Sequence, residues 1–456
     1  AMSSLNQSFP GPRGNALVGM AAASALHFAA FECARPAILA MFSSQRMGFG
    51  EDDAAMPFAT GCISPFSIVL LWFYSRILQE HGPRVALLRS ALLSMGILTI
   101  GGFYLTYAES KIRQGNLFSP YFLFSTRLCT FFLFISQNSL VHLIFTQHWA
   151  FLGSLGQQKG SKDTASAWIA PVAGIGSVFS TLAASSVKKL TDASLSLPDL
   201  LFLAAFILAG SAGAAEFAYT TAEKNGFAPK EEKVKNNKLV SSSPQNSKGE
   251  KMNSASLWNK SRALFRRVPV LGVLCVDVML CQCLSAVVTF LFFRQVRQNI
   301  INDQERAGWT GNCYAWINGL SGVFQFFVIP MIVTRWNMLG LWAIMPAIMG
   351  FLTFCMAWTT QQQQEDTRFQ TLSIVAGAFS TMKILEYSFH GVCNELLFAS
   401  LDYESRHVGK QEIALLANRF SKSLTAVTLS LLTKYMTSRR LDCILSWTAC
   451  LFTIPW

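Results

Sequence analysis

Charged side chains are scarce in this sequence. Asp, Glu, Lys and Arg make up 14% of its 456 residues, whereas soluble domains carry about 25%. A large soluble core does not explain the deficit, because a soluble protein still needs a polar surface in contact with water. The scarcity excludes an ordinary soluble domain and favours a polytopic helical membrane protein, whose lipid-facing surface needs no charge.

Signatures of catalysis and metal binding are missing as well. The 11 Cys form no CxxC pair and the six His form no HExxH motif, so the sequence predicts neither a zinc site nor a disulfide framework. The segment at 409–411 lacks the preceding glycine and the Ser or Thr of a P-loop. We therefore expect no enzyme activity, no metal and no cofactor. Nucleic acid is not an expected partner either, because the positive charge lies mostly in one segment without interleaved aromatic residues.

Long apolar runs indicate what the chain is. Each is near or above the about 20 residues that a bilayer requires. We predict an all-α polytopic membrane protein with about 12 transmembrane helices in two six-helix halves, residues 1–222 and 267–456. The runs lie at about 14–43, 54–79, 85–108, 118–150, 164–187 and 195–222, and again at about 267–293, 308–335, 338–359, 369–399, 411–435 and 440–456.

The two predicted halves are joined by a basic polar linker, residues 223–266. Residues 223–267 hold eight Lys and three Arg against four Glu, a net charge of +7 out of +12 for the whole chain. Such a segment buries too little apolar surface to fold alone. We interpret it as a solvated linker, with contact to anionic lipid headgroups as the alternative.

The ends of the chain carry two further expectations. The sequence starts at Ala1 with no charged-then-apolar segment before the first run, so we expect that any targeting segment has been removed. The last run is short and stops at Trp456 without a polar tail, so we expect that the true C-terminus lies beyond it.

The halves look like an internal repeat. The second run ends in YSRILQEHGPR and the eighth in VTRWNMLG, each with an Arg and then a Gly before the next apolar run. Six helices, a central loop and six more helices are the plan of major-facilitator-like transporters, whose substrate site lies between the halves near the bilayer midplane. The plan predicts a carrier before it indicates what is carried.

Ionisable residues inside the first and fourth runs are costly in lipid, so each is a candidate functional residue. Glu32 and Arg35 are three residues apart and can neutralise each other, which leaves a structural pair and a substrate-facing Arg35 as alternatives. In the fourth run we expect Gln137 and Asn138 to form hydrogen bonds between helices.

The tenth and eleventh runs carry the densest polar residues. Lys383, Glu386, His390 and Asn394 are spaced by three, four and four, which predicts one polar helix face along an aqueous cavity or a helix contact. Lys383 and Glu386 can also pair with each other. Arg419 and Lys422 lie one turn apart with no acid within four residues, a pattern that favours binding of an anion such as phosphate.

This region resembles the ATP/ADP carrier family of plastids and of obligate intracellular bacteria and parasites. The family shows a segment like YIPLDEESKVKGKAAIDVVGSRLGKSGG, and a K-x-x-K-Y pattern upstream that corresponds here to Lys383, Glu386 and Tyr387. The resemblance is specific over about 380–425 and topological elsewhere. The segment is matched without a gap at Leu401, Asp402, Glu404, Ser405, Gly409, Lys410, Ile413, Arg419, Lys422 and Ser423.

Some positions depart from the family pattern. Glu386 stands where the family has a second Lys, which reverses a charge. Two family glycines are Leu424 and Thr425 here, the family acid of the fourth run falls near Gln137, and the acid of the seventh run falls in LSAVVTFLFF, where there is none. These changes put the transport activity in question more than the fold.

The resemblance implies exchange of ATP for ADP, or nucleotide uptake with protons, in the lipid bilayer. It also favours a plastid membrane, with the inner envelope first. Strict exchange would follow if unneutralised cations made the empty carrier costly to close. Two alternatives stay open: a non-transporting scaffold or accessory subunit of a membrane assembly, and a carrier of another organic anion. We predict that substrate is bound by Arg35, Lys383, Tyr387, Arg419 and Lys422, and that coupling or gating involves Glu32, Gln137, Glu386, His390, Asp402, Glu404 and Lys410.

Overall fold

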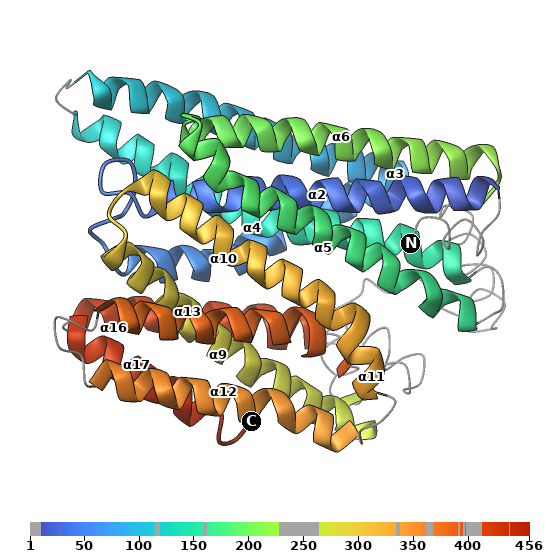
Figure 1. Ribbon diagram of the computed structural model, residues 1–456. Helices are drawn as coiled ribbons and strands as arrows, with labels where there is room; N and C mark the ends of the chain where they lie inside the picture. Colours follow the sequence, from blue (N-terminus) through green and yellow to red (C-terminus); the bar gives the residue numbers. More distant parts are fainter. Residues whose placement is uncertain are drawn as a thin grey trace, which may run out of the picture. The chain divides into compact units, whose positions relative to one another are not determined.

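The computed structural model is built from long helices (Figure 1). The all-α prediction is therefore confirmed for the part of the chain that the structure describes. That part comprises residues 11–114, 119–157, 162–227, 264–333, 338–361, 368–390, 393–394, 397, 413–436 and 438–456.

A glycine divides the longest helical run before the linker. Gly82 has φ 84° and ψ 174°, a region that essentially only glycine adopts, and Pro83 after it has no N–H to donate. The two arms correspond to the second and third apolar runs of the sequence. The helices before the linker are α2 (Pro12–Phe42), α3 (Ala55–Arg113), α4 (Pro120–Gln157), α5 (Lys162–Asp192) and α6 (Leu197–Lys224).

Among the residues that the structure describes after the linker, three π-helical turns interrupt the helices. They are η1 (Phe324–Val328), η3 (Leu385–His390) and η5 (Ala414–Phe420). The α-helices are α9 (Pro269–Asn299), α10 (Asp303–Val323), α11 (Ile329–Val333), α12 (Met338–Gln361), α13 (Arg368–Ile384), α16 (Ser421–Tyr435) and α17 (Ser438–Phe452).

The helix count agrees with the sequence prediction. With α3 taken as two helices and each π-interrupted helix as one, the described residues contain six helices before the linker and six after it. Seven of the described helices are long and apolar enough to cross a membrane. The prediction of a polytopic membrane protein is confirmed.

The chain forms two compact units, and neither is a contiguous half of the sequence. The first unit contains Ala1–Asp52, Pro65–Val240 and Ile300–Phe326; the second contains Asp53–Ser64, Ser241–Asn299 and Phe327–Trp456. Helix α10 therefore packs with the first unit, and the start of α3 packs with the second. The division at residues 223–266 stays a prediction about the sequence repeat.

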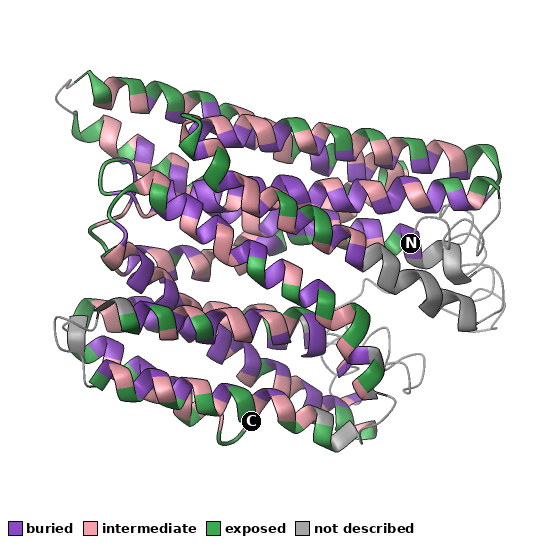
Figure 2. Ribbon diagram, viewed as in Figure 1, coloured by how far each residue is buried: buried purple, intermediate pink, exposed green. Residues whose placement is uncertain are grey.

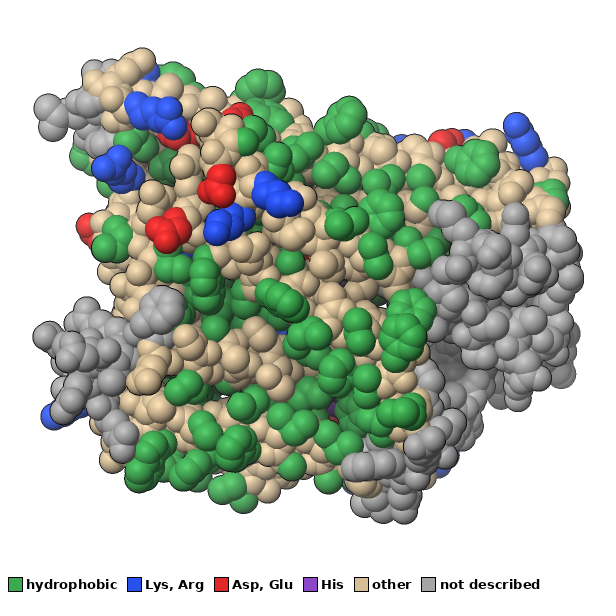
Figure 3. Space-filling model, in the orientation of Figure 1, with side chains coloured by type: hydrophobic (Ala, Val, Ile, Leu, Met, Phe, Trp, Pro, Cys, Tyr) green, Lys and Arg blue, Asp and Glu red, His purple; other side chains and the backbone are tan. Residues whose placement is uncertain are grey.

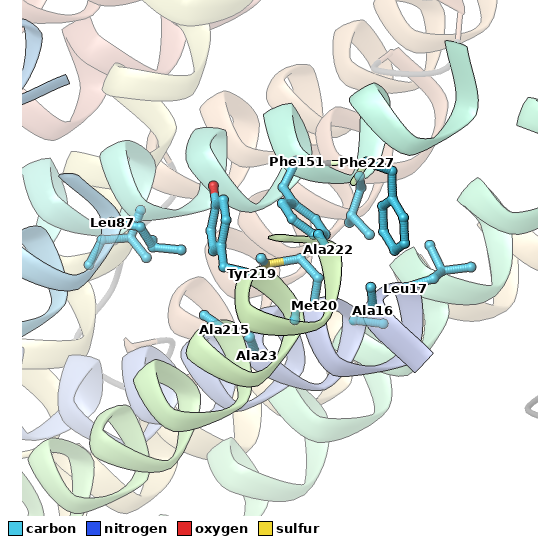
Figure 4. Close-up of a cluster of buried hydrophobic side chains, with 14 residues drawn as sticks. Ala16, Leu17, Met20, Ala23, Leu87, Phe151, Ala215, Tyr219, Ala222 and Phe227 are labelled. Atoms are coloured by element: carbon cyan, nitrogen blue, oxygen red, sulfur yellow. The ribbon is translucent and has the colours of Figure 1, made fainter. Parts of the chain in front are cut away.

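Helix α2 lies at the centre of the first unit, in contact with α4, α5, α6 and α10. Close approach depends on small residues: a Cβ placed on Gly19 would lie 3.0 Å from the Phe217 ring of α6. Ala16, Met20, Phe151 and Tyr219 belong to the buried cluster at this contact (Figure 4). Close packing of small and aromatic side chains thus fixes α2 against α6.

Helix α9 has the corresponding role in the second unit, where it contacts α13, η5, α16 and α17. Phe292 of α9 and Phe379 of α13 stack in parallel with ring centroids 4.0 Å apart. The contact between α9 and α13 matters for function, because the polar residues of both helices meet there.

Many large apolar side chains are exposed, Phe103, Phe206 and Trp358 among them. Figure 2 shows exposed and buried residues alternating along individual helices, and Figure 3 shows hydrophobic side chains spread over the face in view. Contiguous apolar surface of this kind suits contact with lipid chains and would be a liability in water.

Candidate functional site

A polar ladder runs between α9 and the α13–η3 helix inside the second unit. Lys383 Nζ lies 2.6 Å from Glu386 Oε2 and donates to Ser285 Oγ at 2.9 Å. Gln282 Nε2 donates to Glu386 Oε1 at 3.1 Å, and Ser285 Oγ donates to Glu386 Oε2 at 3.3 Å. The predicted polar face of the tenth run is therefore a helix contact, and its Lys–Glu pair is formed.

The ladder continues one to two turns further with an acid that the sequence prediction missed. His390 Nε2 lies 2.7 Å from Asp277 Oδ2, and Trp456 Nε1 donates to Asp277 Oδ1 at 2.7 Å. Asn394 Nδ2 lies 3.4 Å from His390 Nδ1. The polar residues Asp277, Cys281 and Ser285 are spaced by four in an apolar run, and that spacing was the signal for a polar face on this helix.

Two of the described π-helical turns, η3 and η5, contain predicted site residues. Turn η3 contains Glu386, Tyr387 and His390, and turn η5 contains Arg419. π-turns are rare in proteins, but those that occur often lie at functional sites. The added residue changes the direction of the side chains and disrupts the regular hydrogen bonding of the helix. Their position supports a functional role for this part of the second unit.

Arg419 and Lys422 differ in their surroundings. Arg419 is half-buried, and within the described residues its Nη1 atom is buried without a hydrogen-bond partner. Its backbone carbonyl accepts from Ser64 Oγ at 2.9 Å, and Ser423 Oγ contacts the same Ser64 hydroxyl at 2.5 Å. Lys422 lies close enough to Glu386 to act on it electrostatically. A half-buried guanidinium of this kind can receive an anion.

Tyr387 is 37% exposed beside this cluster. Lys383 Nζ lies 5.7 Å from the centroid of its ring, within cation–π range. The residue is partly accessible, and stacking of its ring on an adenine stays a prediction.

Arg35 in the first unit is paired in the same way as Lys383. Its Nη1 atom lies 2.9 Å from Glu32 Oε1. The guanidinium also lies over two rings, 3.9 Å from the centroid of Tyr314 in α10 and 4.5 Å from that of Phe31. The predicted i, i+3 ion pair is thus present, and Tyr314 is a contact that sequence spacing could not show.

Gln137 fixes α4 to α2 beside this pair. Its Nε2 atom donates to the carbonyl oxygen of Phe31 at 3.2 Å, so the expected interhelical hydrogen bond is confirmed. The same expectation for Asn138 is wrong: its side chain donates at 2.7 Å to Phe134 O, one turn back in its own helix. An amide that satisfies its own helix removes the need for a partner across the interface.

Three predicted coupling residues, Asp402, Glu404 and Lys410, lie outside the described residues. The structure therefore brings together Lys383, Glu386 and Lys422 in the second unit, and Glu32, Arg35 and Gln137 in the first.

A buried ionic cluster near the end of α9 was not predicted. Arg294 lies 3.2 Å from Asp53 and 3.3 Å from Asp442, and Arg297 also pairs with Asp53. The cluster joins α9 to α17 and to the segment before α3. The members of this cluster are far apart in sequence, so no local spacing of residues predicts their contacts.

The chain also matches a known family. Residues 167–456 match the TLC ATP/ADP transporter family. The matched stretch is more than half of the sequence and includes every described residue of the polar ladder in the second unit. A search of curated protein sequences finds no significant match.

Solved structures share the fold at low identity. The nucleoside transporter NupG is 12% identical with a TM-score of 0.59, over 96% of this chain and 98% of that one. The xylose transporter XylE from E. coli is 11% identical with a TM-score of 0.58, over 97% of each chain. A bacterial homologue of the iron transporter ferroportin is 12% identical with a TM-score of 0.61, over 98% of each.

These likenesses agree with the helix count and with the apolar surfaces of the helices. The resemblance first drawn from residues 380–425 is confirmed over a much longer stretch. The chain belongs to the TLC ATP/ADP transporter family, and by family and fold it is an integral membrane carrier and not an enzyme.

Proposed function

We propose that the carrier exchanges adenine nucleotides, ATP against ADP, by alternating access. The observation that carries the proposal is Arg419, a half-buried guanidinium whose Nη1 atom has no hydrogen-bond partner within the described residues. An unsatisfied buried donor is costly, and a planar guanidinium matches the geometry of a phosphate. Family membership makes a nucleotide phosphate the first candidate.

Lys422 supports the same proposal from the next helical turn. Its charge adds to that of Arg419 three residues earlier in the chain, and a ligand with several negative charges would gain from both cations. Arg35, Lys383 and Tyr387 are proposed as further ligand contacts, and Glu32, Gln137, Glu386, His390, Asp402, Glu404 and Lys410 as coupling or gating residues. A plastid inner envelope is proposed as the membrane, on the family resemblance alone.

The test is uptake of labelled ATP into liposomes that contain the purified carrier and are preloaded with ADP. We expect uptake in the wild type and its loss in Arg419→Ala and Lys422→Ala. Arg440→Ala, at an exposed arginine of α17, is the matched control and should leave uptake unchanged. Uptake that survives both site variants would contradict the proposal.

A second candidate is an accessory subunit of a membrane assembly that does not transport. The ion pairs Arg35–Glu32 and Lys383–Glu386 favour it, because they occupy two predicted substrate cations. Folded protein with neither exchange nor a nucleotide-dependent thermal shift would select this candidate.

A carrier of another organic anion is the third candidate. Glu386 supports it, since a carboxylate paired with Lys383 changes the charge that a ligand meets. Competition of labelled ATP uptake by unlabelled organic anions would identify such a ligand.

A further inference from the structure

Two predicted substrate cations are each held by a carboxylate on their own helix. Arg35 lies 2.9 Å from Glu32 in the first unit, and Lys383 lies 2.6 Å from Glu386 in the second. In both pairs the partners are three residues apart, and all four side chains are at most 16% exposed. The protein itself thus supplies an anion to each cation when no ligand is bound.

Glu386 is bound as a ligand anion would be. One of its oxygens contacts Lys383 and accepts from Ser285, and the other accepts from Gln282. Lys422 also acts on this carboxylate electrostatically. A cation, a hydroxyl and an amide donor are the groups that would receive a carboxylate or a phosphate oxygen.

Glu32 neutralises Arg35 beside two aromatic rings. One carboxylate oxygen binds Arg35, while the rings of Tyr314 and Phe31 lie over the guanidinium. The side chain of Glu32 is 5% exposed. Without this carboxylate, the charge of Arg35 would sit among aromatic rings with little access to water.

The consequence concerns the carrier without a ligand. Closing a site around an unpaired cation leaves a buried charge without compensation, whereas a cation beside a carboxylate keeps its counter-charge when it is enclosed. Strict exchange requires that the empty carrier cannot reorient, and an unpaired cation in the site would prevent reorientation. Carboxylates of the protein itself neutralise such cations and therefore allow the empty carrier to reorient.

We infer that Glu32 and Glu386 are tethered counter-anions of the empty carrier, which lets the protein catalyse net nucleotide uptake in addition to exchange. The inference rests on the proposed nucleotide transport. Arg419 has no carboxylate partner within the described residues, so closing the empty carrier around Arg419 still costs free energy. Net uptake is therefore slower than exchange but measurable.

The test compares two sets of liposomes, one loaded with ADP and one with buffer only. Potassium and valinomycin hold the membrane potential at zero, and initial rates of labelled ATP uptake are measured in both. For the wild type we expect net uptake within about tenfold of the exchange rate, a factor that corresponds to a small difference in barrier.

The variants measure the ratio of net uptake to exchange. Glu386→Gln and Glu32→Gln, one in each unit, should each lower this ratio about tenfold or more, because a buried cation that has lost its carboxylate then has to be enclosed. The double variant Lys383→Met with Glu386→Gln removes both charges and should restore the ratio. Glu109→Gln, which removes the partner of exposed Arg113, is the control and should not change it.

Each outcome of this test either supports or overturns the counter-anion role. Exchange without any uptake into buffer-loaded liposomes overturns this inference and leaves the nucleotide exchanger standing. An unchanged ratio in both Gln variants also overturns it. Neither exchange nor uptake by folded wild-type protein overturns both proposals together. A lowered ratio that the double variant restores establishes the counter-anion role.

Discussion

Asp277 Oδ2 lies 2.7 Å from His390 Nε2, while its other oxygen accepts from the indole of Trp456. One carboxylate of α9 thereby fixes both the η3 turn and the residue Trp456 after α17. Ionisable residues are costly inside a membrane helix unless they are paired, and this pairing explains how α9 tolerates an acid in the middle of an apolar run.

Asp277→Leu should destabilise the second unit by leaving two half-buried donors, His390 and the Trp456 indole, without an acceptor. Each unsatisfied donor costs about 1–3 kcal/mol. Trp456→Phe removes only one of the two donors and should cost less. Thermal unfolding in detergent checks the order. Equal melting temperatures for Asp277→Leu and the wild type would show that the carboxylate does not contribute to the stability of the fold.

Arg294→Met should be among the most destabilising substitutions in α9. It leaves Asp442, which is 5% exposed, without its cation, and removal of one partner of a buried pair costs about 3–5 kcal/mol. Adding Asp442→Leu to Arg294→Met should recover stability, because both charges are then gone. A double variant no more stable than the single one would contradict this account of the cluster.

Gly82→Ala should lower stability by about 1–3 kcal/mol, since φ 84° and ψ 174° are strained for any residue with a Cβ. Gly377→Ala in α13 is the matched control: nothing lies within 4 Å of its added Cβ, and alanine favours the helix. Chemical denaturation of the two variants side by side measures the difference. A neutral Gly82→Ala would mean that the kink relaxes freely.

Gly19→Leu should separate α2 from α6. An added Cβ already lies 3.0 Å from Phe217, and overpacking of a close contact costs about 1–3 kcal/mol. Gly96→Leu in α3 meets open space around its Cβ and serves as the control. The comparison is again thermal unfolding, and similar melting temperatures for both variants would argue against tight α2–α6 packing.

Hydropathy was enough to predict the class of fold, because lipid imposes a helix length and an apolar surface that are visible residue by residue. Hydropathy also located most helix bounds. The break between the second and third runs is visible in the sequence as well, because Gly82 and Pro83 end one helix locally. The membership of α10 in the first unit was not predictable, because it depends on contacts such as Gly311 against Ala184 of α5, which no single-helix pattern contains.

The candidate site was predictable where its geometry is local. Glu32–Arg35 and Lys383–Glu386 follow from i, i+3 spacing on a helix. The contacts of Asp277 with His390 and of Arg294 with Asp442 join positions more than 100 residues apart, so they required the packed structure. The π-turns were not predictable either, because their sequences look α-helical.

Those π-turns bear on how relatives should be aligned to this chain. A π-turn contains one residue more than an α-turn, and one residue corresponds to roughly 100° around a helix axis. Described side chains that follow residues 385–390 and 414–420 therefore point in directions that a regular helical wheel misplaces. A relative that lacks one residue in either stretch would keep its helix and rotate everything beyond it, so a single-residue gap there marks a change of geometry and not merely of length.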